Sequence, residues 1–157
     1  MSLRDDIERW VDGRKVALVK EYREEGLKAS GRWEKELTSD VTFSDSSIKI
    51  RIDGAHYTEY LVRGRGKGGG GTFLQKIIRQ WIDDKGISPD GGITKDELAK
   101  RIAWKIHREG IRVPNRFNSG TFIDRVFYTT DGTLSQFRDM LKRHYAIEIK
   151  RKITQGL

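Results

Sequence analysis

Three glycines, Gly64, Gly66 and Gly69, fit the G-x-G-x-x-G pattern that wraps the pyrophosphate of a dinucleotide. In dinucleotide-binding proteins this pattern follows a parallel strand and precedes an acidic residue about 20 positions further on. Here the preceding strand belongs to a predicted antiparallel meander, and the nearest acidic residues, Asp83 and Asp84, fall inside the following predicted helix. We therefore interpret the pattern as a glycine-rich turn and not as a nucleotide site.

The other residue types that carry catalysis or bind metals also lack a functional spacing. The phosphate-loop motif requires Ser or Thr after its lysine, whereas Gly68 follows Lys67. The histidines, His56, His107 and His144, are scattered over separate predicted elements without the spacing of a metal-ligand set. The chain contains no cysteine, which excludes a disulfide framework and a thiolate zinc site. The sequence predicts no enzyme activity, no catalytic residue, no cofactor and no metal site.

The segment from Arg63 to Gly71 combines three cations with six glycines. Cations spaced in this way can follow a phosphate backbone or enter an acidic groove of a protein. Because glycine leaves the backbone unrestrained, we expect a flexible glycine-basic loop that a partner orders. Single-stranded bases stack on aromatic side chains, and this loop has none. The predicted interface consists of Arg63, Gly64, Arg65, Gly66, Lys67, Gly68, Gly69, Gly70 and Gly71.

The residues after this loop predict an amphipathic helix over residues 72–85. Thr72 and Gln75 have the spacing of a capping box, and Lys85 followed by Gly86 suits a helix end. Apolar side chains recur at intervals of three and four residues, which places them on one face. The predicted core combines this face with one strand residue and with the next helix. It consists of Tyr60, Leu74, Ile77, Ile78, Trp81, Ile82, Leu98, Ile102 and Ile106.

Three further helices are expected from similar local signals. Residues 94–109 predict a helix whose capping box is formed by Thr94 and Glu97. Residues 2–25 predict a long helix with acidic residues in its first turn. A short helix is predicted to begin at Thr133, with a capping-box spacing of its own.

Period-two alternation of apolar and polar residues predicts the strands. Residues 36–43, 48–52 and 56–62 alternate in this way and are separated by turn-forming residues, so they predict an antiparallel meander. Residues 147–153 alternate similarly and predict a strand at the sheet edge. The expected fold class is α+β, an antiparallel β-meander packed against the long N-terminal helix and two or three further amphipathic helices. We expect a single domain over residues 1–157.

Two tryptophans lie outside the apolar faces of the predicted helices. Trp33 precedes the first predicted strand, and Trp104 falls on the polar side of the helix over 94–109. Such residues either belong to the core or anchor a protein interface, where Trp is enriched. The sequence leaves both interpretations open.

The chain of 157 residues has a formal net charge of +8, and this charge is unevenly distributed. Residues 1–62 contain 11 Lys and Arg against 13 Asp and Glu, whereas residues 63–157 contain 20 against 10. A basic second part favours contact with phosphate or with an acidic protein face, and charge alone does not choose between them. No apolar run approaches the roughly 20 residues that span a bilayer, so we expect no membrane partner.

Several short motifs occur in a characteristic order after the N-terminal helix. They are GRWEKEL at 31–37, HYTEYLVRGRG at 56–66, LQKIIRQWIDDKGI at 74–87, ELAKRIAWKIHREGI at 97–111 and TFIDRVF at 121–127. In this order the chain resembles the tail-completion proteins of long-tailed bacteriophages, small neck subunits also described as head-tail joining or minor tail components. Members of that family usually have a shorter turn after the tyrosine strand, whereas four successive glycines follow Lys67 here.

The resemblance implies a structural virion protein that assembles as a ring in the neck. Its expected partners are further copies of itself, the head-connector or head-closure protein, and the tail terminator or tail tube protein. Genome DNA would pass through the lumen without sequence-specific contact. The expected location is the virion neck, after assembly in the host cytoplasm, with no small-molecule substrate.

An alternative hypothesis is that the chain is a nucleic-acid-binding module and not a part of a virion. A small basic module could bind nucleic acid by gripping phosphates with the glycine-basic loop and the basic helices that follow it. This hypothesis and the neck hypothesis use the same cations, so the sequence alone does not separate them.

Overall fold

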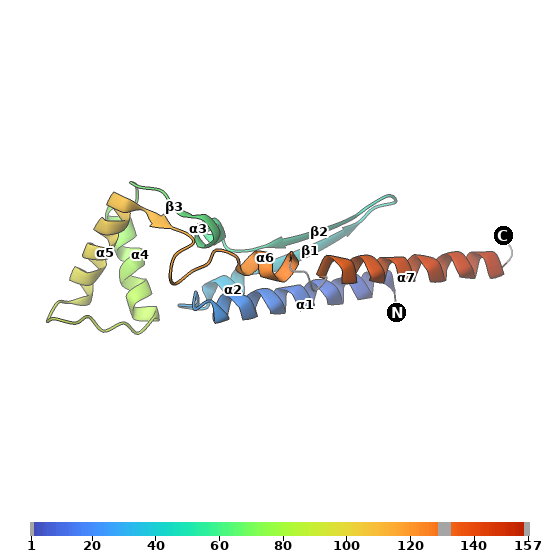
Figure 1. Cartoon of the computed structure of the whole chain (residues 1–157), viewed down its shortest axis with the longest axis horizontal. Coiled ribbons are helices and arrows are strands. Elements are labelled where there is room, and N and C mark those ends of the chain that lie inside the picture. The colour runs from blue at the N-terminus through green and yellow to red at the C-terminus, as the bar shows by residue number, and fades with distance from the viewer. Residues whose placement is uncertain (1, 129–132, 156–157) are drawn as a thin grey trace. The chain divides into compact units, whose positions relative to one another are not determined.

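The computed structural model describes residues 2–128 and 133–155 and combines helices with antiparallel strands (Figure 1). The expected α+β fold class is confirmed. Contacts divide the described chain into two compact units. The first unit comprises residues 1–21, 38–53 and 121–157, and the second comprises residues 22–37 and 54–120. The single domain over 1–157 stays a prediction.

Helix α1 (Leu3–Glu24) confirms the predicted long N-terminal helix. Its start is closed by Ser2, whose hydroxyl accepts a hydrogen bond from the backbone N–H of Asp5 at 3.2 Å. The apolar residues at helical spacing lie on one side and are buried in the first unit. They are Ile7, Val11 and Leu18.

Strands β1 (Thr38–Phe43) and β2 (Ile48–Asp53) form the predicted antiparallel hairpin. The backbone N–H of Ser44 donates to the carbonyl oxygen of Ser47 at 2.9 Å and closes the turn. Alternate residues on both strands share one half-buried face, as period-two alternation requires. The apolar members of that face are Val41, Phe43, Ile48, Ile50 and Ile52.

Helix α6 (Phe122–Phe127) completes the first unit together with helix α7 (Thr133–Thr154). Phe122 has no exposed surface, and Nε of Arg125 donates to a carboxylate oxygen of Glu21 on α1 at 2.7 Å. The short apolar segment after residue 121 is therefore a helix that packs on α1.

The predicted strand over residues 147–153 is wrong, because these residues continue α7. Ile147 and Ile149 fit a period of two, but Ile149 and Ile153 also fit the four-residue spacing of a helix. A helix satisfies its backbone hydrogen bonds locally, whereas an added strand requires an adjacent sheet edge. The predicted capping box at Thr133 borders residues 129–132, which lie outside the described residues.

In the second unit, helix α2 (Arg32–Glu36) buries Trp33. The Trp33 ring stacks on Tyr22 at 4.4 Å between centroids, and its Nε1 donates to Oγ1 of Thr58 at 2.9 Å. Burial beside these rings raises the pKa of Tyr22 to about 12. Trp33 is therefore a core residue, the first of the two interpretations open to it.

The third predicted strand over residues 56–62 is also wrong, because helix α3 (Thr58–Arg63) occupies that segment. The chain turns after β2, where the backbone N–H of Thr58 donates to the carbonyl oxygen of Ala55 at 2.8 Å. The tertiary contact between Trp33 and Thr58 holds this turn. In the helical conformation Tyr60 faces outward and is 54% exposed, so its predicted place in the core is wrong.

Helices α4 (Gly71–Asp84) and α5 (Lys95–Glu109) form an antiparallel pair that confirms both predicted helices. Thr94 and Glu97 form the predicted capping box. The capping box predicted at Thr72 is wrong, because α4 begins one residue earlier and Thr72 lies within it. The core of the pair consists of Leu74, Ile78, Ile102, Ala103 and Ile106.

The buried face of α4 is narrower than the sequence suggests. Ile82 has no exposed surface, but Ile77 is 48% exposed and Trp81 is 38% exposed, so their predicted places in the core are wrong. The packed face of α5, with Ile102, Ala103 and Ile106, covers a single stripe of α4 that contains Leu74 and Ile78. Leu98 and Ile102, also predicted as core, are half-buried.

Among the described helices, none combines the length and the apolar content that crossing a bilayer requires.

Candidate interaction surface

The glycine-basic loop is shorter than predicted and is attached to the rest of the second unit. Arg63 ends α3, and the next two residues form strand β3 (Gly64–Arg65), which pairs antiparallel with strand β4 (Ile111–Arg112). Gly71 already belongs to α4. The predicted bounds of a free loop, residues 63–71, are therefore wrong, and residues 66–70 form the turn between β3 and α4.

Close backbone approach explains two of the glycines around this turn. Gly64 and Gly110 both have positive φ angles, 80° and 75°. A Cβ on Gly64 would collide with the carbonyl oxygen of Ile111, and a Cβ on Gly110 would collide with that of Arg65. The β3–β4 pair therefore requires glycine at both positions.

The turn itself is bound to the end of α5. The backbone N–H of Gly68 donates to the carbonyl oxygen of His107 at 2.7 Å. Nδ1 of His107 lies 3.3 Å from the carbonyl oxygen of Gly69. His107 therefore positions the turn through its backbone and its ring, a role for which its sequence context carried no signal.

The three cations of the predicted interface have different environments. Arg63 is exposed and pairs with Glu59 at 3.5 Å. Arg65 is half-buried, and its Nη1 has no hydrogen-bond partner among residues 2–128 and 133–155. Lys67 is exposed and contributes to lowering the pKa of Glu109, which is lowered mainly by the hydrogen bond from Arg108. The segment does not present its cations as one continuous row.

A second set of cations lies on the exposed side of α5 and was not among the predicted interface residues. Trp104 is 58% exposed, and the Arg108 guanidinium lies 4.3 Å from its ring centroid. Spacings of three, four and seven residues place these side chains together, so helical periodicity applied to the cations would have found them. The cationic face of α5 consists of Lys100, Arg101, Lys105 and Arg108.

An apolar stripe lies on the exposed side of α4. Phe73, Ile77 and Trp81 are spaced by four residues and all three are exposed. Gln80 donates to Asp84 at 2.9 Å beside this outer stripe of α4. Exposed apolar side chains in a row favour contact with another protein surface.

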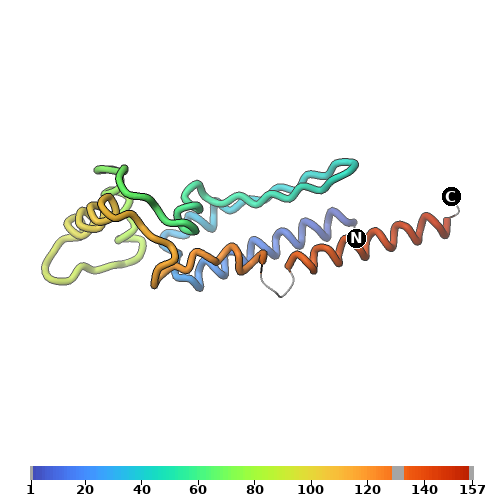
Figure 2. Tube along the Cα trace, turned by 45° about the horizontal axis from the view of Figure 1, so that its top comes forward, coloured from blue at the N-terminus to red at the C-terminus, as the bar shows by residue number. Residues whose placement is uncertain are grey.

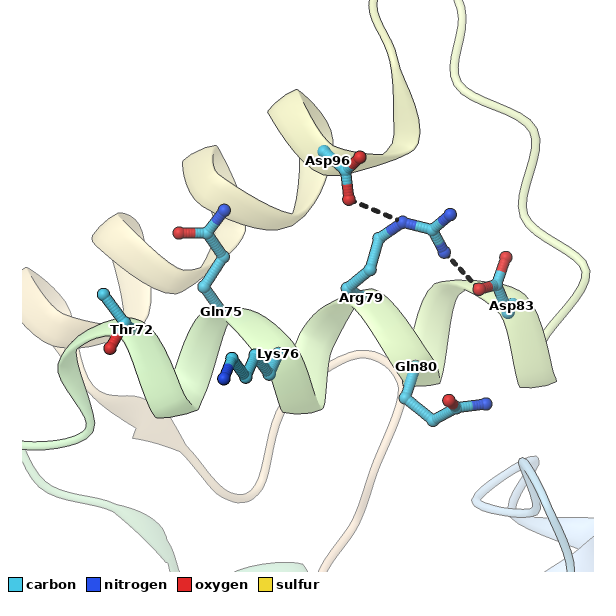
Figure 3. A pocket seen from close by; sticks show the side chains of 7 residues that line it. All are labelled: Thr72, Gln75, Lys76, Arg79, Gln80, Asp83 and Asp96. Atoms are coloured by element: carbon cyan, nitrogen blue, oxygen red, sulfur yellow. Dashed lines mark hydrogen bonds and ion pairs between the residues drawn. The ribbon is translucent and has the colours of Figure 1, made fainter.

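A shallow polar depression lies between α4 and α5 (Figure 3). In it, Arg79 donates from Nε to Asp96 at 2.9 Å and also pairs with Asp83. Lys95 donates to Asp83 at 2.8 Å, and this hydrogen bond is the main cause that lowers the pKa of Asp83. These charged groups neutralise one another, so the depression joins the two helices and offers no activated nucleophile or base.

The described parts of the chain contain no group of three or more His, Cys, Asp or Glu that could hold a metal ion. The G-x-G-x-x-G glycines also lack a dinucleotide context, because β3 pairs antiparallel with a two-residue strand and not within a parallel sheet. Residues 56–62 do not form the predicted third strand, but the glycines that follow them still border an antiparallel pair of strands, β3 and β4.

No family model, curated protein or solved structure matches this chain. A proposal about function therefore depends on the surfaces of the two units and on the order of the sequence motifs.

Proposed function

We propose that this chain is a structural virion protein of a tailed bacteriophage. It acts as a neck or tail-completion subunit in a ring that joins the head connector to the tail. The observation that carries this proposal is the presence of regularly spaced apolar side chains on the outside of both units. The function is assembly, without catalysis or a cofactor.

In the second unit these side chains form the outer stripe of α4, and in the first unit they lie on α7. Tyr145, Ile149 and Ile153 are exposed there at the same four-residue spacing. A free monomer rarely leaves such contiguous apolar surface in water, because burying it against a partner is favourable by about 25 cal/mol per Å². Two such stripes, one in each unit, favour a subunit with more than one neighbour.

The motifs of the phage resemblance correspond to separate structural elements, which supports this choice of assembly. GRWEKEL contains α2, HYTEYLVRGRG contains α3 and β3, and TFIDRVF contains α6. Each of α2 and α6 supplies a side chain with almost no exposed surface, Trp33 and Phe122 respectively. Residues of these motifs therefore contribute to the cores of the two units, and the exposed apolar stripes would form the contacts between copies.

In the proposed ring the cations have a separate role. Arg63, Lys67 and the cationic face of α5 provide positive charge for contact with the genome that passes through the lumen, without reading its sequence. The turn at residues 66–70 contacts a neighbouring protein of the neck.

Immunogold electron microscopy of virions from the source phage tests the proposal. Antibody raised against the purified full chain is expected to place gold at the head-tail junction, with pre-immune serum as the control. Unlabelled particles together with negative blots of denatured virions would contradict a virion location.

The cationic face of α5 favours a second candidate, a nucleic-acid-binding module. Lys100, Arg101 and Lys105 are exposed and form no ion pair within the described parts of the chain. A dedicated binder would hold duplex DNA at physiological salt, with affinity falling linearly on a log-log plot as salt rises. Replacing these three residues by alanine should then reduce the slope by about one for each phosphate that is no longer neutralised. A neck subunit would bind DNA weakly as a monomer, with or without the substitutions.

A further inference from the structure

Helices α1 and α7 pack side by side in the first unit with a defined register. The rings of Trp10 and Phe137 lie 4.7 Å apart, and Nη1 of Arg14 donates to Oγ1 of Thr133 at 3.0 Å. Arg14 follows Trp10 by four residues on α1, whereas its partner Thr133 precedes Phe137 by four residues on α7. The two helices are therefore antiparallel. With this register, Leu3 at the start of α1 lies opposite about residue 144 of α7.

The remaining part of α7, residues 145–154, extends beyond the start of α1, as Figures 1 and 2 show. We call this segment the α7 overhang. Its apolar side chains are uncovered, with Ile147 69% and Ile153 70% exposed. Exposed apolar side chains in a row favour contact with another surface, because burying them is favourable. The α7 overhang therefore offers an apolar face to a partner.

The charge of this segment limits what the surface can be. Residues 145–154 contain three cations and one acidic residue, Glu148, and so have a net charge of +2. Two overhangs packed against each other would place these like charges together, which is unfavourable. The partner surface must combine a place for apolar side chains with acidic groups. The three cations are Lys150, Arg151 and Lys152.

The outer side of α1 has this combination. Asp5, Arg9, Asp12 and Val16 share one side of the helix, because spacings of three, four and seven residues return to the same side. All four are exposed, Val16 by 71%, and Arg9 pairs with Asp6 at 3.3 Å. Hydrogen bonds from Ser2 lower the pKa of Asp5, so this carboxylate is charged at neutral pH. Residues 3–12 contain four acidic residues and two cations, a net charge of −2.

Gly13 lies on the same outer side, in the middle of α1. No heavy atom of the described residues lies within 4 Å of the place where its Cβ would stand. Glycine inside a helix is destabilising relative to alanine, and nothing within the described part of the first unit requires it here. A bare backbone at this point allows a second helix to approach closely.

We propose that the α7 overhang of one copy packs along the outer side of α1 of a second copy of this chain. Tyr145, Ile149 and Ile153 cover Gly13 and Val16, and the cations of the overhang face the acidic residues of α1. Each copy then uses α7 toward one neighbour and α1 toward the other, a head-to-tail interface that closes into a ring. This inference rests on the proposed ring and names the surfaces that form it.

Cysteine cross-linking tests the inference directly, because the chain has no cysteine of its own. Two single variants of the full chain, Ile149→Cys and Val16→Cys, are purified, mixed and treated with a short bismaleimide. Within one chain these positions are out of reach, since Ile149 lies about 24 Å further along α7 than Thr133, which contacts α1 at Arg14. We expect a cross-linked dimer from the mixture and none from either variant alone.

The control replaces Val16→Cys with Ser46→Cys, an exposed position in the turn of the β1–β2 hairpin, and should give no dimer. If Ile149→Cys fails to fold by circular dichroism, Ile153→Cys takes its place. Adding Asp12→Lys to Val16→Cys should lower the dimer yield several-fold, because it reverses a charge that faces the overhang.

Three results would overturn the inference. The first is a dimer from Ile149→Cys alone in equal yield, which would mean that overhangs pair with each other. The second is the absence of a dimer from the mixture at concentrations where sedimentation shows oligomers. The third is a chain that sediments as a monomer at high concentration and gives no dimer. Immunogold labelling is read on intact virions, so the proposed neck function can stand or fail separately from these results.

Discussion

Two isoleucines of α4 have opposite environments. Ile82 has no exposed surface, whereas Ile77 keeps 48% of its surface exposed. We expect Ile82→Ala to lower the free energy of unfolding by about 2–5 kcal/mol, because it leaves a cavity in the core. Ile77→Ala should cost about 1 kcal/mol or less, because half of the side chain remains in water in the folded state. Urea denaturation followed by circular dichroism measures both, and equal losses would show that Ile77 is covered in the free protein.

Gly110 and Gly66 make a second matched pair. Gly110 has a φ of 75°, and a side chain there would collide with the backbone of β3. Gly110→Ala should lower the free energy of unfolding by about 2 kcal/mol or more, because both the left-handed backbone conformation and the steric collision would destabilise the folded state.

At Gly66 no heavy atom of the described residues lies within 4 Å of the place of a Cβ, and its φ is not positive. Gly66→Ala should therefore change the free energy of unfolding by about 1 kcal/mol at most. A similar loss for both variants would contradict the β3–β4 pairing.

At the scale of elements, the two threonines near the starts of α4 and α5 differ in role. Thr94 accepts a hydrogen bond from the backbone N–H of Glu97 at 3.2 Å, whereas Thr72 lies inside α4 and caps nothing. Thr94→Ala should cost about 0.5–2 kcal/mol of stability, because it leaves helix N–H groups unsatisfied. Thr72→Ala should be neutral within about 0.5 kcal/mol. Thermal unfolding of the two variants under one buffer condition distinguishes them.

The ion pairs between α4 and α5 predict a dependence of stability on pH. The hydrogen bond from Lys95, followed by that from Arg79, lowers the pKa of Asp83 in the folded state. A lowered folded pKa contributes stability above the unfolded pKa of about 4, and this contribution is lost as the pH falls through the folded value. Asp83→Asn should therefore destabilise the protein at pH 7 and reduce the loss of stability on acidification below about pH 4.

Melting temperatures of wild type and Asp83→Asn between pH 2 and 7 measure this difference. Asp84→Asn is the control, because Asp84 lies next in sequence but bonds to Gln80 on α4 itself. If the melting temperatures of wild type and Asp83→Asn fall equally on acidification, the ion pairs between α4 and α5 add no stability.

At the scale of the whole molecule, the outer stripe of α4 should affect association more than folding. The double variant Phe73→Ser with Ile77→Ser removes two exposed apolar side chains, so the melting temperature should change little. Its sedimentation coefficient should depend less on concentration than that of wild type, because apolar surface for a partner is gone. Lys76→Ser on the same helix is the control, and loss of folding in the double variant would mean that the stripe is part of the core.

Elements whose signals are local could be predicted from the amino-acid sequence alone. Capping at Thr94, apolar periodicity in α1, α4 and α5, and alternation in the β1–β2 hairpin all depend on residues a few positions apart. Because the same residues form the hydrogen bonds and the apolar face of each element, the structure places these elements where the sequence predicts them.

Tertiary packing determined what the ambiguous segments become and which faces are covered. Residues 56–62 alternate as a strand would, and the hydrogen bond from Trp33 to Thr58 accompanies their helical outcome. Residues 147–153 also fit a helical spacing, and they continue α7, whose earlier part packs through Phe137 on Trp10. The periodicity of α4 does not reveal that α5 covers one stripe and leaves Ile77 exposed. Burial depends on the width and place of a partner surface that lies far away in sequence, and a local pattern carries no record of it.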